Sequence, residues 1–196
     1  MNPFPFQYPV TPLVRKHAPG GYQHWEPYRD WLRDEFDFRC VYCLQREPWG
    51  KRRAIFAIDH IVARAAGGAP FDYDNLAYVC ASCNSNKTDD AVPHPARCAY
   101  GRSVSVDEEG RITANDTAGR QLIRALRLDD EENTRYRRMM LWLLQQQAER
   151  DKSEFLRMMS YPGDLPDLGS RRPPTNAKPG SWEQSHHARG DGGKVY

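Results

Sequence analysis

Apolar residues divide the chain into short periodic segments separated by polar and proline-rich stretches. In residues 25–36 they recur at helical spacing, which predicts an amphipathic helix. The stretch AIFAIDHIV (54–62) is apolar and β-branched and predicts a buried strand, and LAYV (76–79) predicts a second short strand. ASCNSNKTDD (81–90) predicts a helix that stops before two nearby prolines. We therefore expect a compact unit of strand, loop, strand and helix.

The segments on either side of this unit differ in character. Residues 1–24 contain five prolines and predict an extended arm. SVSVDEEGRITA (103–114) predicts a hairpin, 115–128 a helix, and 129–159 one long helix with acidic residues in its first turn. Pro, Gly, Ser and basic residues dominate from Tyr161 onward, so we expect that tail to be disordered. The expected organisation is an arm (1–24), a core (25–97), an extension of hairpin and helices (98–160) and a disordered tail (161–196).

Composition and charge add a local signal to this pattern. The chain has 39% hydrophobic residues and a formal net charge of only +2, too small a bias to indicate a polyanionic partner by itself. Between residues 39 and 64, however, six basic residues face two acidic ones, an excess of four. The basic residues are Arg39, Arg46, Lys51, Arg52, Arg53 and Arg64, and the acidic ones are Glu47 and Asp59.

Membrane and secretory signals are missing from the sequence. No run of eighteen apolar residues occurs, and the N-terminal residues lack a basic leader followed by an apolar block. We therefore expect a cytoplasmic protein with no membrane partner.

Five cysteines point to metal binding rather than to disulfides. Four of them form two CxxC pairs, and Cys98 is left over. The two-pair spacing predicts a closed, tetrahedral structural zinc site that ties together the ends of the long intervening stretch 44–79. The predicted zinc ligands are Cys40, Cys43, Cys80 and Cys83.

An adjacent acid and imidazole, Asp59 and His60, lie between the two cysteine pairs. Phosphodiester hydrolysis needs a base near neutral pH and a hard cation that neutralises developing charge. We expect His60 to be the base, and Asp59 and Asn84 to hold Mg²⁺ or another divalent cation through oxygen atoms. Because neighbouring side chains of a strand face opposite ways, the strand should bend or end at this pair. Lys87 shares the helical face of Asn84 and is either a phosphate contact or a solvated lysine.

The motifs IDHIVARAAGG, DNL and CASCNSNK, framed by the two CxxC pairs, resemble the HNH endonucleases. The resemblance extends from Cys40 to Lys87 and implies the ββα-metal fold of that family. It assigns Asp59 and Asn84 to the metal-binding positions and His60 to the general base. It also assigns Asn75 to the middle position, which braces the loop and helps orient the base. Asn in place of the usual final His is similar to the HNH variant of RNA-guided nucleases and several restriction enzymes.

These observations together predict an α+β protein: a small ββα-metal core with structural zinc, flanked by helices and a disordered C-terminal tail. The segment from Gly110 to Arg138 is similar to the tail of many bacterial stand-alone HNH proteins. The predicted function is metal-dependent cleavage of DNA, with Arg64 and the run Lys51, Arg52 and Arg53 as further phosphate-contact candidates. Two alternatives remain open: a non-catalytic zinc module that binds DNA or protein, and a defence or toxin nuclease that requires a partner protein.

Overall fold

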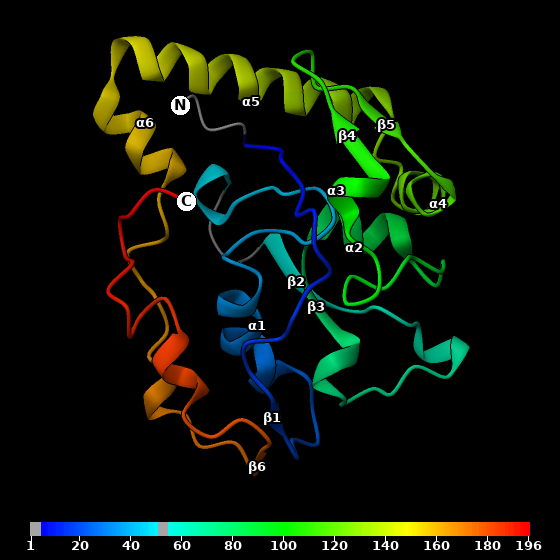
Figure 1. Ribbon diagram of the computed structural model, residues 1–196, viewed down its shortest axis with the longest axis vertical. Coiled ribbons are helices and arrows are strands. Elements are labelled where there is room, and N and C mark those ends of the chain that lie inside the picture. Colours follow the sequence, from blue (N-terminus) through cyan, green and yellow to red (C-terminus); the bar gives the residue numbers. More distant parts are fainter. Residues whose placement is uncertain (1–4, 51–54) are drawn as a thin grey trace.

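The computed structural model describes residues 5–50 and 55–196. Its centre is an antiparallel pair of strands, β2 (Phe56–His60) and β3 (Leu76–Cys80), followed directly by α2 (Ala81–Lys87). α2 packs against both strands, and α1 (Arg29–Glu35) packs against β3 (Figure 1). The predicted mixed architecture of helices around a small sheet is therefore confirmed.

The register of the hairpin fixes the ends of its strands. Asp59 pairs with Ala77 and His60 pairs with Leu76, so β2 ends at His60. All five residues of β3 are buried, which matches the uniformly apolar sequence LAYVC. A buried ion pair ties α1 to this hairpin, because Arg33 donates two hydrogen bonds of 2.8 Å to Glu47, which also accepts from the Tyr78 hydroxyl at 2.7 Å.

The extension after the core begins with α3 (Tyr100–Ser103) and the predicted hairpin of β4 (Val104–Val106) and β5 (Ile112–Ala114). α4 (Thr117–Leu126) packs against α2 and β5, and Asp116 caps its first turn by accepting from Gly119 N. A Cβ atom at Gly119 would lie 2.0 Å from the Ser103 carbonyl oxygen, so only glycine permits this close approach.

The predicted single helix over 129–159 is two helices in the structure. α5 (Glu131–Arg150) is followed by Asp151, its C-cap, and α6 (Lys152–Met159) begins immediately after that residue. The Asp151 side chain accepts hydrogen bonds from the backbone N–H groups of Ser153 and Glu154, which caps α6. The prediction was wrong because it followed the helical periodicity through Asp151, although Asp is a typical N-cap residue that can begin a new helix.

Residues 161–196 are packed against the rest of the protein, so the expectation of a disordered tail is corrected. They contain η6 (Leu168–Ser170), β6 (Thr175–Asn176) and η7 (Ser181–Gln184), and β6 pairs with β1 (Pro19–Gly20) of the N-terminal arm. The segment runs down the left side of the molecule in Figure 1, and its β6 residues line a pocket together with residues 71–74 of the loop that joins β2 and β3.

Aromatic contacts and one buried histidine hold this C-terminal segment in place. Tyr196 stacks on Tyr161, and the Arg46 guanidinium lies over the Tyr196 ring. The His186 ring is buried and lies 3.0 Å from carboxylate oxygens of both Asp37 and Asp191. Composition predicted disorder because these few aromatic and histidine anchors are scattered among many polar residues.

A buried polar cluster joins this C-terminal segment to α1. Asp34 Oδ1 lies 2.8 Å from His17 Nε2, and Asp34 Oδ2 accepts from the His186 backbone N–H at 2.7 Å. Burial opposes the ionisation of Asp34 and Asp37, but hydrogen bonds with His17 and His186, together with the nearby charge of Lys16, outweigh it. The pKa of Asp34 is therefore lowered, and that of Asp37 is lowered to about 2.

Acid should weaken the docking of the C-terminal segment. Because the folded-state pKa of Asp37 lies below the unfolded value of about 3.9, its contribution to stability is present above about pH 4 and is lost as the pH falls towards 2. We expect Asp37→Asn to lower the melting temperature at pH 6, and the difference from wild type to shrink between pH 4 and pH 2. Thermal unfolding across this range checks the prediction, with Glu108→Gln in an exposed turn as control. A constant difference at every pH would contradict it.

Candidate functional site

The four cysteines of the two CxxC pairs converge in the structure. Their sulfur atoms all lie within 4.8 Å of one another, and the Cys43 and Cys80 sulfurs are 3.6 Å apart. Four thiolates bound to zinc at about 2.3 Å would lie about 3.8 Å apart, whereas a disulfide needs about 2.0 Å. The donor set and its spacing therefore fit a tetrahedral metal ion such as zinc, held by Cys40, Cys43, Cys80 and Cys83.

Cys80 connects this cluster to the secondary structure. It is the last residue of β3 and the N-cap of α2, where its sulfur accepts from the Cys83 backbone N–H at 3.4 Å. Hydrogen bonds among the four thiols lower the pKa of Cys80 and raise those of Cys43 and Cys83. A bound cation would stabilise the thiolate form of all four cysteines.

Asp59 is linked to this cluster through Tyr42, which lies inside the first CxxC pair. The Tyr42 hydroxyl donates to Asp59 Oδ2 at 2.8 Å, and Lys87 Nζ donates to Asp59 Oδ1 at 3.2 Å. Asp59 and Lys87 are both buried. Burial raises the pKa of Asp59 above its usual range, although Lys87 and Tyr42 oppose that shift by stabilising the anion.

His60 makes a different set of contacts. Its Nε2 lies 3.0 Å from the Pro70 carbonyl oxygen, and its ring meets the edge of Trp25 at a centroid distance of 5.5 Å. A carbonyl oxygen only accepts, so Nε2 must carry the hydrogen of the neutral ring. Nδ1 is then the nitrogen with a lone pair available to accept a proton.

Asn75 holds the loop that carries Pro70. Its Oδ1 accepts from Val62 N at 2.9 Å, and its Nδ2 donates to the carbonyls of Val62 and Ala69 at 3.1 and 3.0 Å. Gly68 permits this arrangement, because a Cβ there would lie 1.9 Å from the Val62 carbonyl oxygen. Asn75 therefore fixes the residue next to the carbonyl that orients His60.

Asn84 lies on α2, half-buried, one helical turn before Lys87. Residues three apart share a helical face, so Asn84 and Lys87, which reaches Asp59, lie on the same side of α2. The oxygen donors of Asp59 and Asn84 suit a hard divalent cation. Each Asp59 oxygen already accepts one hydrogen bond, which leaves lone pairs for a metal but places the Lys87 ammonium beside it.

The basic residues predicted to contact phosphate differ in their exposure and in their partners. Lys87 is fully buried and also donates to the His60 carbonyl at 2.8 Å, so it is neither a solvated lysine nor available to phosphate. The prediction of Lys87 as a phosphate contact is therefore corrected, because its ammonium group pairs with the Asp59 carboxylate. Arg64 is exposed, whereas Arg46 is buried and Arg39 pairs with Asp37 at 3.5 Å. Lys51, Arg52 and Arg53 lie outside the described residues.

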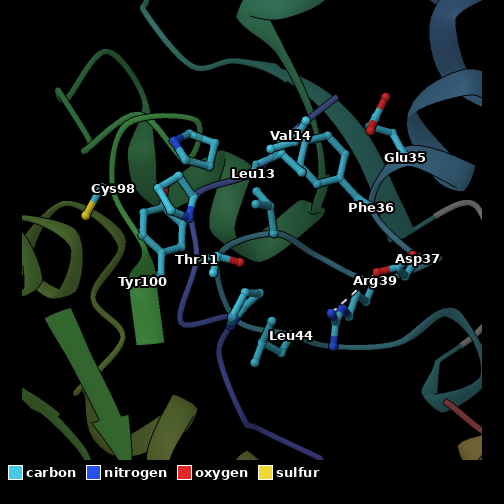
Figure 2. Close-up of a pocket in the computed structure, with 14 residues that line it drawn as sticks. Thr11, Leu13, Val14, Glu35, Phe36, Asp37, Arg39, Leu44, Cys98 and Tyr100 are labelled. Atoms are coloured by element: carbon cyan, nitrogen blue, oxygen red, sulfur yellow. Dashed lines mark ion pairs between the residues drawn. The ribbon is translucent and has the colours of Figure 1, made fainter. Parts of the chain in front are cut away.

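A pocket of about 230 Å³ lies elsewhere, between the N-terminal arm and the first cysteine pair. Figure 2 shows mainly apolar side chains in its lining, with Asp37 and Arg39 as an ion pair among them. None of the predicted catalytic or metal-binding residues belongs to that lining. This pocket is therefore separate from the candidate site around His60.

A second arrangement has the residue types of a nucleophilic triad. His17 Nδ1 lies 3.2 Å from Ser181 Oγ, and His17 Nε2 lies 2.8 Å from Asp34 Oδ1. All three side chains are buried, so a substrate cannot reach the serine hydroxyl. The arrangement attaches the C-terminal segment to α1 and is not an active site.

Part of the chain matches a known protein family. Residues 40–90 match the HNH endonuclease family model. The matched region contains the cysteine cluster, β2, β3 and α2, so the predicted resemblance is confirmed. It indicates a nuclease-type function on nucleic acid. No curated protein matches the chain, and no described helix has both the length and the apolar character needed to cross a membrane.

Two residues that contact Asp59 and His60 were not identified from the sequence. Tyr42 lies between the zinc-spaced cysteines, but nothing in the motif shows that its hydroxyl reaches Asp59. Trp25 falls within the predicted amphipathic helix (25–36), yet it is not buried as Trp31 and Leu32 are, and it lies against His60. Helical periodicity could not separate them, because Trp25 precedes the helical residues and points to the loop after β2.

The cysteine cluster of the HNH region should bind one zinc ion per chain. We expect Cys80→Ser to remove the ion and lower the melting temperature strongly, because Cys80 is also the N-cap of α2. Cys98→Ser, outside the cluster, is the matched control and should keep both properties. Elemental analysis and thermal unfolding check this prediction. A zinc-free protein with wild-type melting would contradict it.

Proposed function

We propose that this protein is a metal-dependent HNH endonuclease that hydrolyses DNA phosphodiester bonds. The observation that supports this most directly is the placement of His60 within the HNH region. Its Nε2–H is held by Pro70, and its Nδ1 is left to accept a proton. Beside it in the chain, Asp59 offers a carboxylate that burial and two donors fix in one orientation.

In the proposed reaction, His60 Nδ1 removes a proton from water as the water oxygen attacks phosphorus. The bond from phosphorus to the leaving oxygen breaks in the same displacement. The resulting imidazolium keeps its Nε2–H bond to the Pro70 carbonyl, which stabilises the positive ring. Asn75 acts indirectly, because it holds Ala69 and thereby the carbonyl that orients the base.

Asp59 and Asn84 would hold a divalent cation such as Mg²⁺. When bound, the cation neutralises charge on the phosphate and on the leaving oxygen. Tyr42 and Lys87 position the Asp59 carboxylate. Burial, together with the Asp59 charge, raises the pKa of Tyr42, so its hydroxyl remains protonated and continues to donate.

Removal of the base should abolish most cleavage without abolishing DNA binding. We expect His60→Ala to lower the cleavage rate by about 10² to 10⁴, the usual contribution of a general base. His187→Ala changes an exposed histidine of the C-terminal segment and serves as the matched control. Plasmid cleavage and DNA affinity, measured on the same preparation, check the prediction.

Two results would count against this mechanism. Near-wild-type cleavage by His60→Ala would mean that another group, or a contaminating nuclease, performs the reaction. If wild-type protein binds DNA but cuts none with any divalent metal, the non-catalytic zinc module becomes the better interpretation.

Loss of a metal ligand should raise the Mg²⁺ concentration required for cleavage. Asn84→Ala is expected to do this with little effect on stability, because Asn84 is only half-buried. Asp59→Asn should also destabilise the fold, by about 3–5 kcal/mol, because it leaves the buried Lys87 charge without its counter-ion.

A double variant separates the effect of Asp59 on metal binding from its effect on the stability of the fold. Asp59→Asn combined with Lys87→Met removes both buried charges and should recover much of the melting temperature while cleavage stays low. Metal titrations and thermal unfolding of the three variants check this. Normal cleavage by Asn84→Ala and by the double variant at low Mg²⁺ would exclude the assigned ligands.

A further inference from the structure

Trp25 connects two groups of the candidate site that are far from it in sequence. Its ring meets the His60 imidazole edge-on at a centroid distance of 5.5 Å and an interplanar angle of 80°. The Arg64 guanidinium carbon lies over the same indole, 5.9 Å from the ring centroid. Both partners belong to β2 and the loop that follows it, whereas Trp25 immediately precedes η1 (Glu26–Tyr28) in the N-terminal part.

Trp25 also packs against a second aromatic side chain of the loop after β2. Phe71 stacks on the indole at 6.2 Å with an interplanar angle of 18°, and Arg64 lies over the ring as well. Phe71 in turn meets His24 edge-on at 6.4 Å. The indole thus already contacts three side chains, those of His60, Arg64 and Phe71.

Arg64 is well placed to present a positive charge to a substrate. It is exposed, and no carboxylate among the described residues forms an ion pair with it, in contrast to Arg33, Arg39 and Arg111. A guanidinium over an indole face is attracted by the ring and keeps its N–H groups at the edge available for phosphate. The indole thus restricts an otherwise mobile side chain beside the loop that holds His60.

We propose that Trp25 is a positioning residue that orients the His60 imidazole and holds Arg64 for contact with the nucleic-acid phosphate. This inference rests on the proposed nuclease function. It predicts two separable effects of Trp25. The contact with His60 affects the chemical step, and the contact with Arg64 affects substrate affinity.

Trp25→Ala tests both effects against Arg64→Ala. We expect Trp25→Ala to lower kcat about ten- to a hundredfold, because a small displacement of a catalytic group costs rate of this order. The salt dependence of DNA affinity should fall by about one phosphate contact in both single variants. In the Trp25→Ala/Arg64→Ala double variant it should fall no further. Trp25→Phe should restore most of kcat, because a phenyl ring retains part of the contact with His60.

A spectroscopic measurement makes the test independent of cleavage. In protein labelled with ¹⁵N-histidine, the His60 signal, identified by its loss in His60→Gln, should show a single Nε2–H tautomer at pH 8. We expect Trp25→Ala to change this signal, and Trp142→Ala, which alters an exposed tryptophan on α5, to leave it unchanged. Melting temperatures verify that each variant is folded.

The outcomes distinguish this inference from the function on which it rests. An unchanged His60 signal together with wild-type kcat in folded Trp25→Ala would overturn the positioning role. A salt dependence that falls in Arg64→Ala but not in Trp25→Ala would overturn the second contact. If wild-type protein does not cut DNA, the nuclease proposal fails by itself, while the His60 signal and the salt dependence still decide the role of Trp25.

Discussion

Convergence of four cysteine sulfurs is the constraint on which the candidate site depends. The cluster joins the turn at residues 40–43 to the junction of β3 and α2, so it closes the segment of the chain that contains the hairpin. Tyr42 lies within that turn and donates to Asp59. The zinc-type cluster and the Asp-His pair therefore occur together for a physical reason, because the cluster fixes the residue that orients the acid.

The buried ion pair between Lys87 and Asp59 is the second contact that holds the site together. Lys87 is buried with Asp59 and also binds the His60 carbonyl, so α2 is attached to the last two residues of β2. Removing either charge alone would leave the other uncompensated in a low-dielectric environment. The side chains of Asp59 and His60 thus have separate supports. Tyr42 and Lys87 hold Asp59, while Pro70 and Trp25 contact the His60 ring and Asn75 holds the loop that carries Pro70.

The two terminal segments stabilise this small core from outside. The arm supplies His17 and Lys16 to the carboxylates of α1 and the following turn, and the C-terminal segment supplies His186 to the same carboxylates. Arg46, next to the first cysteine pair, donates to the Met159 carbonyl at the end of α6 and lies over Tyr196. A two-stranded sheet with one short helix has little core of its own, so these added contacts supply stabilisation that its own core lacks.

The sequence by itself determined the two core strands, the helix after them and the metal-ligand spacing. Strand-like runs gave β2 and β3, the CxxC pairs gave the cysteine cluster, and the ordered motif from Asp59 to Asn84 indicated the HNH family. These signals are local, because periodicity and ligand spacing depend on residues close together in the chain.

Only the tertiary structure decided which charges are exposed and which are buried. Lys87 and Arg46 are buried, Arg64 is exposed, and the polar segment 161–196 is packed through a few anchors such as His186 and Tyr196. The sequence around a lysine on a short helix does not show whether its ammonium group lies in water or beside a carboxylate such as Asp59. The role of Lys87 depends on a partner 28 positions away, and that distance is bridged only when the chain folds.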